Sequence, residues 1–308
     1  MELRHIRYFQ AVAEELSYSR ASRRLRIAQP ALSRAVKEIE EELGVLLFDR
    51  NRSRVRLTEA GVVLQKESAL LMERWEESMR RVRRTAAGEE GELRLGYIGP
   101  PTQPFLGRLL GEYRRRYPRV SLHLEERTPE RVWEMVAKGR LSSGLTRPVR
   151  MGEDLGLQTI LLREERLGAV VPRSHSFATL ESVSWEQLEG EVLIILARRE
   201  GVGLHDAVLA GCRQAGFIPR LGHTPSLIGT VISYVEAGAG VGVVSDSVLI
   251  NNDLLRFVAL EPAVTVPLVL VWQEDADTPS LRRFRELIEE WKMEGRLWGA
   301  AGGAFLER

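Results

Sequence analysis

The first sixty residues carry apolar side chains at the spacing of short amphipathic helices. A first helix is predicted over 2–15, where apolar residues recur every three or four positions, at Leu3, Ile6, Phe9 and Val12. Ser17 and Ser19 are candidate N-caps of a second helix that extends to about Leu25. A tight turn then leads to the segment that begins at Gln29. Two short helices joined by a tight turn favour a helix-turn-helix arrangement.

A third helix is predicted over 29–43. Pro30 stands in its first turn, where the missing N–H removes no hydrogen bond, and Gly44 ends it because glycine accepts a positive φ. Its buried side is expected to consist of Leu32, Val36, Ile39 and Leu43. An alternating strand over 54–57, together with the basic turn before it, predicts a β-wing after this helix.

Residues 58–87 predict one long helix of mixed character. Apolar and small residues recur with a spacing near 3.5, at Leu64, Ser68, Leu71, Trp75, Ser78 and Val82. Glu and Arg occupy many of the other positions, so the helix is too polar for a core and too apolar to stand alone. A coiled-coil dimerisation helix satisfies both conditions, and a helix packed on its own C-terminal domain is the alternative. Gly88 and Gly91 predict a hinge after it.

From residue 91 onward, strands alternate with helices. A first set of strands and amphipathic helices follows the order 92–98, 105–117, 120–124, 128–138 and 143–145. A second set lies at 166–171, 185–188, 192–196, 204–215, 227–237 and 241–244. The chain returns through a strand over 266–272 and a helix over 280–292. This alternation predicts parallel sheets with crossover helices, so the fold class is α/β overall.

The net charge of +1 conceals an uneven distribution. Residues 1–60 hold twelve Lys and Arg against nine Asp and Glu, whereas 91–308 hold 26 against 28. One basic group has no acid among its members: Arg20, Arg23, Arg24, Arg26, Arg34 and Lys37. A second follows an acidic stretch: Arg50, Arg52, Arg54 and Arg56. Basic patches on both sides of one helix are typical of a surface that follows a phosphate backbone, and solvated charges are the simpler alternative.

The outward side of the third helix carries groups that recognise base edges. Gln pairs with adenine, Arg with guanine, Ser contacts several base edges or a phosphate, and Pro packs on a thymine methyl group. The expected DNA contacts on this helix are Gln29, Pro30, Ser33, Arg34 and Lys37. In the wing, Arg52 and Arg54 are expected to contact the DNA backbone or the minor groove.

The run from Tyr18 to Gly61 resembles the DNA-binding domain of LysR-type transcriptional regulators. The family pattern is matched at Ala21, Leu25, Gln29, Pro30, Leu32, Ser33, Ile39, Glu40, Leu43, Gly44, Leu47, Phe48, Arg50, Leu57, Thr58, Ala60 and Gly61. Two positions depart from it. Ala28 stands where members often have Ser, which removes one helix N-cap at a cost of about 0.5–2 kcal/mol. Ser22 stands where members often have Ala.

The resemblance implies a winged helix-turn-helix, a linker helix that forms a coiled coil, and two α/β subdomains resembling a periplasmic binding protein. The expected boundaries are 1–60 for the DNA-binding domain, 58–87 for the linker, 91–161 with 266–292 for subdomain I, 162–265 for subdomain II, and 293–308 for the tail. The resemblance also implies that the chain forms a dimer, and further a homotetramer, which binds a dyad-symmetric operator in double-stranded DNA. RNA polymerase is a further candidate partner.

The effector is expected in the cleft between the two α/β subdomains, because open α/β sheets bind ligands outside the carboxyl ends of their strands. Hydroxyls, cations and helix N–H groups in the loops that follow these strands suit a small anion. Ordinary helix capping is the alternative role for the same groups. The expected contacts are Thr102, Gln103, Thr128, Arg147, Arg198, Gly201, Val202 and Gly203. By resemblance, Thr128 and Arg147 are similar to residues of regulators of aromatic-compound degradation, which implies a small carboxylate or aromatic acid. The family's hydroxyl in the first loop is displaced here, since Gly99 is followed by two prolines.

The sequence shows no sign of an active site, metal or cofactor. It has no G-x-S-x-G elbow and no Walker loop, and the glycines of 238–242 follow a helix and lead into a strand. The five histidines and the single Cys212 lack metal-ligand spacing, and His205 with Asp206 is interpreted as a polar pair at a helix start. An α/β enzyme fused to a DNA-binding domain is the second hypothesis and a solute-binding protein is the third. Without a signal peptide or a membrane-length apolar stretch, the cytoplasm is the expected compartment.

Overall fold

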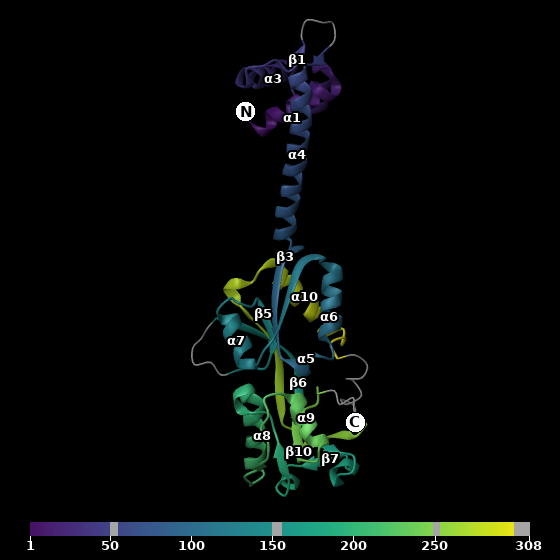
Figure 1. Ribbon diagram of the computed structural model, residues 1–308, viewed down its shortest axis with the longest axis vertical. Coiled ribbons are helices and arrows are strands. Elements are labelled where there is room, and N and C mark those ends of the chain that lie inside the picture. Colours follow the sequence, from purple (N-terminus) through teal and green to yellow (C-terminus); the bar gives the residue numbers. More distant parts are fainter. Residues whose placement is uncertain (50–54, 150–155, 249–252, 299–308) are drawn as a thin grey trace. The chain divides into compact units, whose positions relative to one another are not determined.

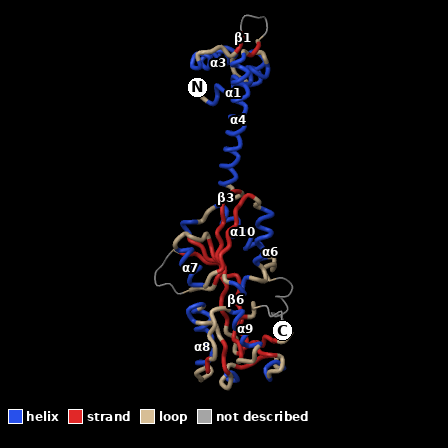
Figure 2. The backbone as a smooth tube through the Cα atoms, viewed as in Figure 1, coloured by secondary structure: helices blue, strands red, loops and turns tan. Residues whose placement is uncertain are grey.

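The computed structural model describes four stretches of the chain: 1–49, 55–149, 156–248 and 253–298. The chain forms two compact units, Met1–Arg83 and Arg84–Arg308 (Figures 1 and 2). The predicted wing contacts at Arg52 and Arg54 lie outside the described residues, as do residues 299–308 of the predicted tail.

Helices and one small sheet build the first unit. Its elements are α1 (Leu3–Glu15), α2 (Tyr18–Leu25), α3 (Gln29–Leu43), β1 (Phe48–Asp49), β2 (Arg56–Leu57) and most of α4 (Glu59–Ala86). The antiparallel strands β1 and β2 form the base of the wing. The core contains Phe9, Val12, Ala21, Leu32, Val36, Ile39 and Phe48. The three predicted helices are confirmed, and their apolar stripes face this core.

One predicted core position in the first unit is wrong. Leu43 is 44% exposed, whereas Leu32, Val36 and Ile39 of the same stripe are buried. Leu43 is the last residue of α3, and the chain turns away at Gly44, whose φ is +69°. The stripe therefore extends one turn beyond the part of the helix that other elements cover.

The start of α4 is fixed by two residues of the family pattern. The Thr58 hydroxyl donates to the Leu46 carbonyl (2.7 Å) and accepts the Gly61 N–H (3.0 Å). A Cβ atom at Gly61 would lie 2.2 Å from the Leu47 carbonyl oxygen, so only glycine allows this close approach. The threonine thus caps α4 and the glycine lets the helix pack against the chain before the wing.

The second unit contains two lobes that share the strands β6 (Leu157–Pro172) and β12 (Thr265–Gln273). Lobe I contains β3 (Glu90–Tyr97), α5 (Gly99–Thr102), α6 (Leu106–Arg116), β4 (Arg119–Glu126), α7 (Pro129–Ala137), β5 (Ser143–Thr146) and α10 (Pro279–Met293). Lobe II contains β7 (Ser182–Ser184), β8 (Val192–Ile194), α8 (Val202–Gln214), β9 (Arg220–Leu221), α9 (Ile228–Glu236), β10 (Val241–Ser245) and β11 (Leu255–Glu261).

The sheets are mixed, so the prediction of parallel sheets is only partly correct. In lobe I, β3 lies parallel to β4 and β5, but β12 pairs antiparallel with β5 and with the first half of β6. In lobe II, β8 lies parallel to β9 and β10, while the second half of β6 pairs antiparallel with β10 and β11. The antiparallel pairs arise because β6 and β12 carry the chain from one lobe to the other.

Two further expectations need correction. The segment 88–91, predicted as a hinge, is partly strand, because β3 begins at Glu90 and pairs with β4 from that residue. The loop predicted after the first strand contains the short helix α5, and the strands β7, β9 and β11 are absent from the prediction.

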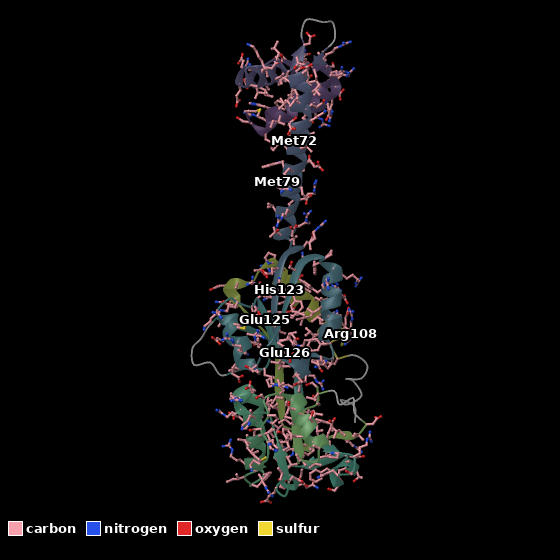
Figure 3. The ribbon with its side chains drawn as sticks, viewed as in Figure 1. Met72, Met79, Arg108, His123, Glu125 and Glu126 are labelled. Carbon is pink, nitrogen blue, oxygen red and sulfur yellow. The ribbon has the colours of Figure 1, made fainter. Side chains whose placement is uncertain are left out.

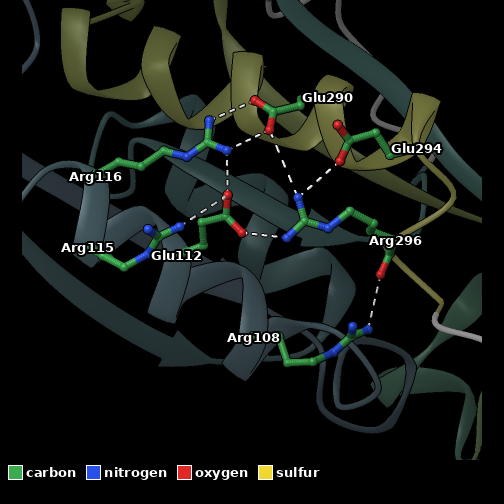
Figure 4. A network of polar contacts seen from close by, with 7 residues as sticks. All are labelled: Arg108, Glu112, Arg115, Arg116, Glu290, Glu294 and Arg296. Atoms are coloured by element: carbon green, nitrogen blue, oxygen red, sulfur yellow. Dashed lines mark hydrogen bonds and ion pairs between the residues drawn. The ribbon is translucent and has the colours of Figure 1, made fainter.

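An ionic network joins α6 to α10 on lobe I (Figure 4). Arg116 pairs with Glu112 and Glu290, and Arg296 pairs with Glu112 (2.6 Å) and Glu294 (3.0 Å). Burial acts to raise the pKa of Glu112, but hydrogen bonds from Arg296 and Arg116 outweigh it and hold the pKa below its usual value. The network fixes α10 and the residues after it on the lobe that carries β3 and β4.

Candidate functional site

The first candidate site is the exposed face of α3. Gln29, Pro30, Arg34 and Lys37 are exposed on this helix and Ser33 is half-buried, so the structure brings the five predicted helix contacts onto one surface. Lys37 pairs with Glu41 (3.0 Å). Within the described part of the chain Arg34 makes no ion pair, so its guanidinium is available to a base edge.

The preceding helix holds the start of α3 in place. The Ser17 hydroxyl accepts the Arg20 N–H and caps α2, as predicted. The Ser19 hydroxyl donates to Gln29 Oε1 (3.0 Å), which orients the first predicted base contact. Arg26 ends α2 with a φ of +57°, and this left-handed residue forms the tight turn between the helices.

Glu40 has a structural role that the apolar pattern did not reveal. Its side chain is buried, and Oε1 accepts the N–H groups of Leu47 (2.9 Å) and Phe48 (3.2 Å). These bonds tie α3 to the first strand of the wing. The sequence identified Glu40 as one residue of the family pattern, beside the buried position Ile39 in an acidic run, but did not indicate that its carboxylate is buried.

The structure confirms that α3 lacks a side-chain cap at Ala28. We expect Ala28→Ser to stabilise α3 by about 0.5–1 kcal/mol, because the serine hydroxyl would accept an N–H in the first turn. Hydrogen exchange of the amides at Ala31 and Leu32 should slow by roughly two- to fivefold. Ala31→Ser places the same hydroxyl inside the helix and is the control. Equal protection in both variants would contradict the capping explanation.

The second candidate site is a cavity of about 640 Å³ in the second unit. It lies where β3, β4, β5, β8 and β10 end, so the segments that follow these strands from both lobes line it. The lining residues are Ile98, Gly99, Pro100, Pro101, Glu126, Arg127, Thr128, Pro129, Arg131, Arg147, Leu196, Glu200, Gly201, Leu204, Ser226, Leu227, Ile228, Ser245 and Val248.

Three of the eight predicted effector contacts line this cavity: Thr128, Arg147 and Gly201. The other five are outside the lining as the described residues define it: Thr102, Gln103, Arg198, Val202 and Gly203. Thr102 is fully buried, and its hydroxyl donates to the carbonyls of Ile98 (2.9 Å) and Gly99 (3.1 Å) in its own helix. Arg198 is exposed and forms a bidentate pair with Asp206 (2.8 and 2.9 Å).

Arg147 connects the two lobes beneath the cavity. It follows β5 in lobe I, and its Nη2 donates to Glu165 on β6 and to the Ser245 hydroxyl at the end of β10 (3.0 Å). Its backbone carbonyl accepts the Trp133 indole N–H (2.8 Å). The side chains of Arg147 and Glu165 are 7% and 0% exposed, so this ion pair is excluded from water.

A second ion pair joins β6 to the end of β10. Arg163 on β6 donates to Asp246 beside the end of β10 (2.7 Å). Burial raises the pKa of the Asp246 carboxyl, and the charge of Arg163 opposes that change. The sequence offered no signal for either pairing, because the partners lie far apart in the chain.

A direct hydrogen bond also links the lobes at the rim of the cavity. The Val202 N–H, at the start of α8, donates to Glu130 Oε1 on α7 (3.1 Å). Among the described residues no other side chain caps α8, so a carboxylate of lobe I takes the place of its N-cap. Val202 was predicted as an effector contact, and its backbone N–H is occupied by a protein group.

Within the described residues, no helix has the length and apolar character that a membrane span requires, and no group of three or more His, Cys, Asp or Glu is arranged to hold a metal ion. Cys212 is buried, and burial raises the pKa of its thiol to about 11.

Two family models match the chain. The model of bacterial regulatory helix-turn-helix proteins of the lysR family matches residues 3–62, and the LysR substrate binding domain matches residues 86–292. The HTH-type transcriptional regulator AlsR of Bacillus subtilis is 32% identical over 286 residues, which are 92% of this chain and 94% of that protein. The uncharacterized HTH-type transcriptional regulator YnfL of Escherichia coli is 33% identical over 292 residues, with coverages of 92% and 97%.

Solved structures of this family have the same fold. The LysR family regulator CbnR matches with a TM-score of 0.78 at 27% identity, covering 94% of this chain and 100% of that one. CbnR in complex with its target DNA matches with a TM-score of 0.79 at 26% identity, with coverages of 95% and 100%. Since these relatives are transcriptional regulators, the enzyme and solute-binding hypotheses are set aside. The chain belongs to the LysR family of DNA-binding transcriptional regulators, whose C-terminal domain binds a small-molecule effector.

Proposed function

We propose that this regulator responds to a small carboxylate, aromatic acids included, bound in the cavity between the lobes. The observation that carries the proposal is that Arg147, whose guanidinium is held by Glu165 and Ser245, lines a largely apolar cavity. Leu196, Leu204 and Leu227 line the same cavity and suit a ring or hydrocarbon chain. The volume of about 640 Å³ falls within the usual range for small-molecule sites.

The same geometry supports a switching mechanism. An effector that contacts Arg147 meets the group that bonds to Ser245 in lobe II, while Glu130 and Val202 link the lobes at the rim. An effector shifts the equilibrium between two lobe arrangements only by its difference in affinity for them. Groups that bond across both lobes supply such a difference, because their contacts change when the lobes move.

Thermal unfolding of the full-length protein with benzoate tests the carboxylate. We expect stabilisation that grows with concentration, by roughly 2.7 kcal/mol at a hundredfold excess over the dissociation constant. Benzamide has the same ring without the charge and should stabilise the protein less. Thr128→Val should weaken the benzoate effect, since this variant loses a lining hydroxyl. Equal stabilisation by the two compounds, or a full benzoate response in Thr128→Val, would argue against the site.

DNA binding is proposed to need two copies of the chain. The helix α4 exposes apolar side chains along its length, including Leu71 (49%), Trp75 (40%) and Val82 (62%), and Met72 and Met79 lie on the same helix (Figure 3). A second α4 would cover these side chains, and the dimer would place two α3 helices on a dyad-symmetric operator.

Pairing of dimers into a tetramer is proposed by family resemblance. Because bacterial operator DNA lies in the cytoplasm, we also propose that compartment.

Trp75→Glu is expected to weaken the dimer roughly tenfold or more, because each chain would place a charge where the proposed interface would bury an aromatic ring. Sedimentation velocity over a range of concentrations measures the change, and operator affinity should fall with it. The exposed residue Glu73 on the same helix supplies the control Glu73→Gln, which should leave the assembly unchanged. A dimer of unchanged affinity in Trp75→Glu would exclude this face of α4 from the interface.

A further inference from the structure

One wall of the cavity has the opposite chemistry from an anion site. It is formed by the residues after β3, where α5 begins with Gly99, Pro100 and Pro101. The two prolines have no N–H, and the Thr102 hydroxyl donates to carbonyls of its own helix. The turn that was expected to donate hydrogen bonds to an anion therefore presents no hydroxyl and only one of its first three N–H groups.

A carboxylate occupies the space beside this turn. Glu126, labelled in Figure 3, is the last residue of β4 and lines the cavity. A Cβ atom built at Gly99 would lie 2.3 Å from Glu126 Oε1, so the carboxylate packs directly against the glycine. Burial, and after it the charge and hydrogen bonding of Glu126, raise the pKa of the neighbouring Tyr97. Because position 99 is a glycine, the Glu126 carboxylate occupies the space that a side chain at this position would fill.

Glu126 also differs from the other charged residues of the lining. Arg127 pairs with Glu125 (2.8 Å), Arg147 with Glu165, and Glu200 with Arg199 (3.1 Å). Among the described residues, no cation pairs with Glu126. A carboxylate accepts several hydrogen bonds, and one beside an apolar cavity is favourable for a ligand that donates to it.

We propose that Glu126 is a specificity-determining residue that accepts a hydrogen bond from a hydroxyl or amino group of the effector. The proposal rests on the carboxylate site proposed above: the effector's carboxylate lies toward Arg147 and its donor toward Glu126. The ligand class is therefore a hydroxy- or amino-substituted carboxylate. A ligand with a second carboxylate at this wall would meet the like charge of Glu126 and bind less well.

Isothermal titration of the full-length protein with matched probes tests the proposal. The probes are benzoate, the three hydroxybenzoates and the three aminobenzoates, with phenol and benzylamine as donors without a carboxylate. At least one substituted benzoate should bind about tenfold more tightly than benzoate. Glu126→Gln should reduce this preference, and Glu126→Leu should abolish it while benzoate itself still binds. Glu189→Gln removes one exposed charge outside the lining and should change nothing.

The outcomes separate this inference from the proposed function. Benzoate binding with no preference for a substituted probe, or a preference that survives Glu126→Leu, overturns the role of Glu126 and leaves the carboxylate site in place. Binding of phenol or benzylamine that is lost in Glu126→Leu, with no carboxylate bound, supports Glu126 and removes the carboxylate. Failure of every probe on the wild-type protein contradicts both. The melting temperature of each ligand-free variant shows that the fold is retained.

Discussion

Replacing Arg147 with Met is expected to destabilise the second unit by about 3–5 kcal/mol. The substitution removes the cation that neutralises Glu165, a carboxylate with no solvent exposure. One oxygen of Glu165 already lacks a hydrogen-bond partner among the described residues, so the carboxylate depends on Arg147 for compensation. Ser245 would lose its bond to the guanidinium as well. Calorimetry should show the melting transition of this unit lowered by roughly 6–20 °C.

Two further variants isolate the cause of this loss. Arg147→Met combined with Glu165→Leu removes both charges and should recover most of the stability, because an apolar pair of similar size avoids the desolvation cost. Arg131→Met alters another arginine of the cavity lining, which is exposed and pairs with the half-buried Glu134, and it should cost less than about 1 kcal/mol. If Arg147→Met were no worse than Arg131→Met, the buried pair would not carry the stability assigned to it.

The sequence predicted the first unit well because its information is local. Apolar spacing and capping residues such as Ser17 and Gly44 determine where α2 and α3 begin and end, and these signals lie within a few positions of their effects. Where the prediction of the core failed, at Leu43, the missing information was how far the neighbouring elements extend over α3. The residues on the exposed face of α3 could be predicted from the same pattern, since residues between buried positions point outward.

The second unit was harder to predict because its decisive pairings are long-range. The segment 163–165, Arg-Glu-Glu, stands before the strand predicted over 166–171, yet it lies inside β6 with Glu165 buried against Arg147. No pattern in the sequence links these two residues. The mixed direction of the sheets has the same origin, since β6 and β12 serve both lobes.

The sequence predicted only part of the lining of the candidate cavity. The rule for the carboxyl ends of strands pointed to the loops at Thr128 and Arg147, and both residues line the cavity, because strand order determines where loops gather. It also suggested Thr102 and Val202, whose polar groups bond to Ile98 and Glu130 instead. A sequence shows that a donor is present and does not show whether the protein already uses it.

Arg34→Ala is expected to weaken binding to the operator by roughly 5- to 150-fold, the loss of one bidentate contact to a base. The reason is geometric: Arg34 is exposed on α3, beside Pro30 and Ser33, and has no ion pair among the described residues that would hold it away from DNA. Fluorescence anisotropy on an operator selected from random duplexes, and on a scrambled duplex, measures the two affinities. The loss on the scrambled duplex should be much smaller, because base contacts carry sequence information and phosphate contacts do not.

Arg52→Ala provides the contrast for this experiment. A wing arginine that contacts phosphate should weaken both duplexes to a similar extent and reduce the slope of log affinity against log salt by about one. Arg34→Ala should leave that slope nearly unchanged if its contact is to a base edge. Equal losses on operator and scrambled DNA for Arg34→Ala would assign it to the phosphate backbone, and sequence recognition would then have to come from Gln29, Pro30 and Ser33. The pair of variants therefore separates base recognition on α3 from electrostatic attraction, although both involve the same side-chain chemistry.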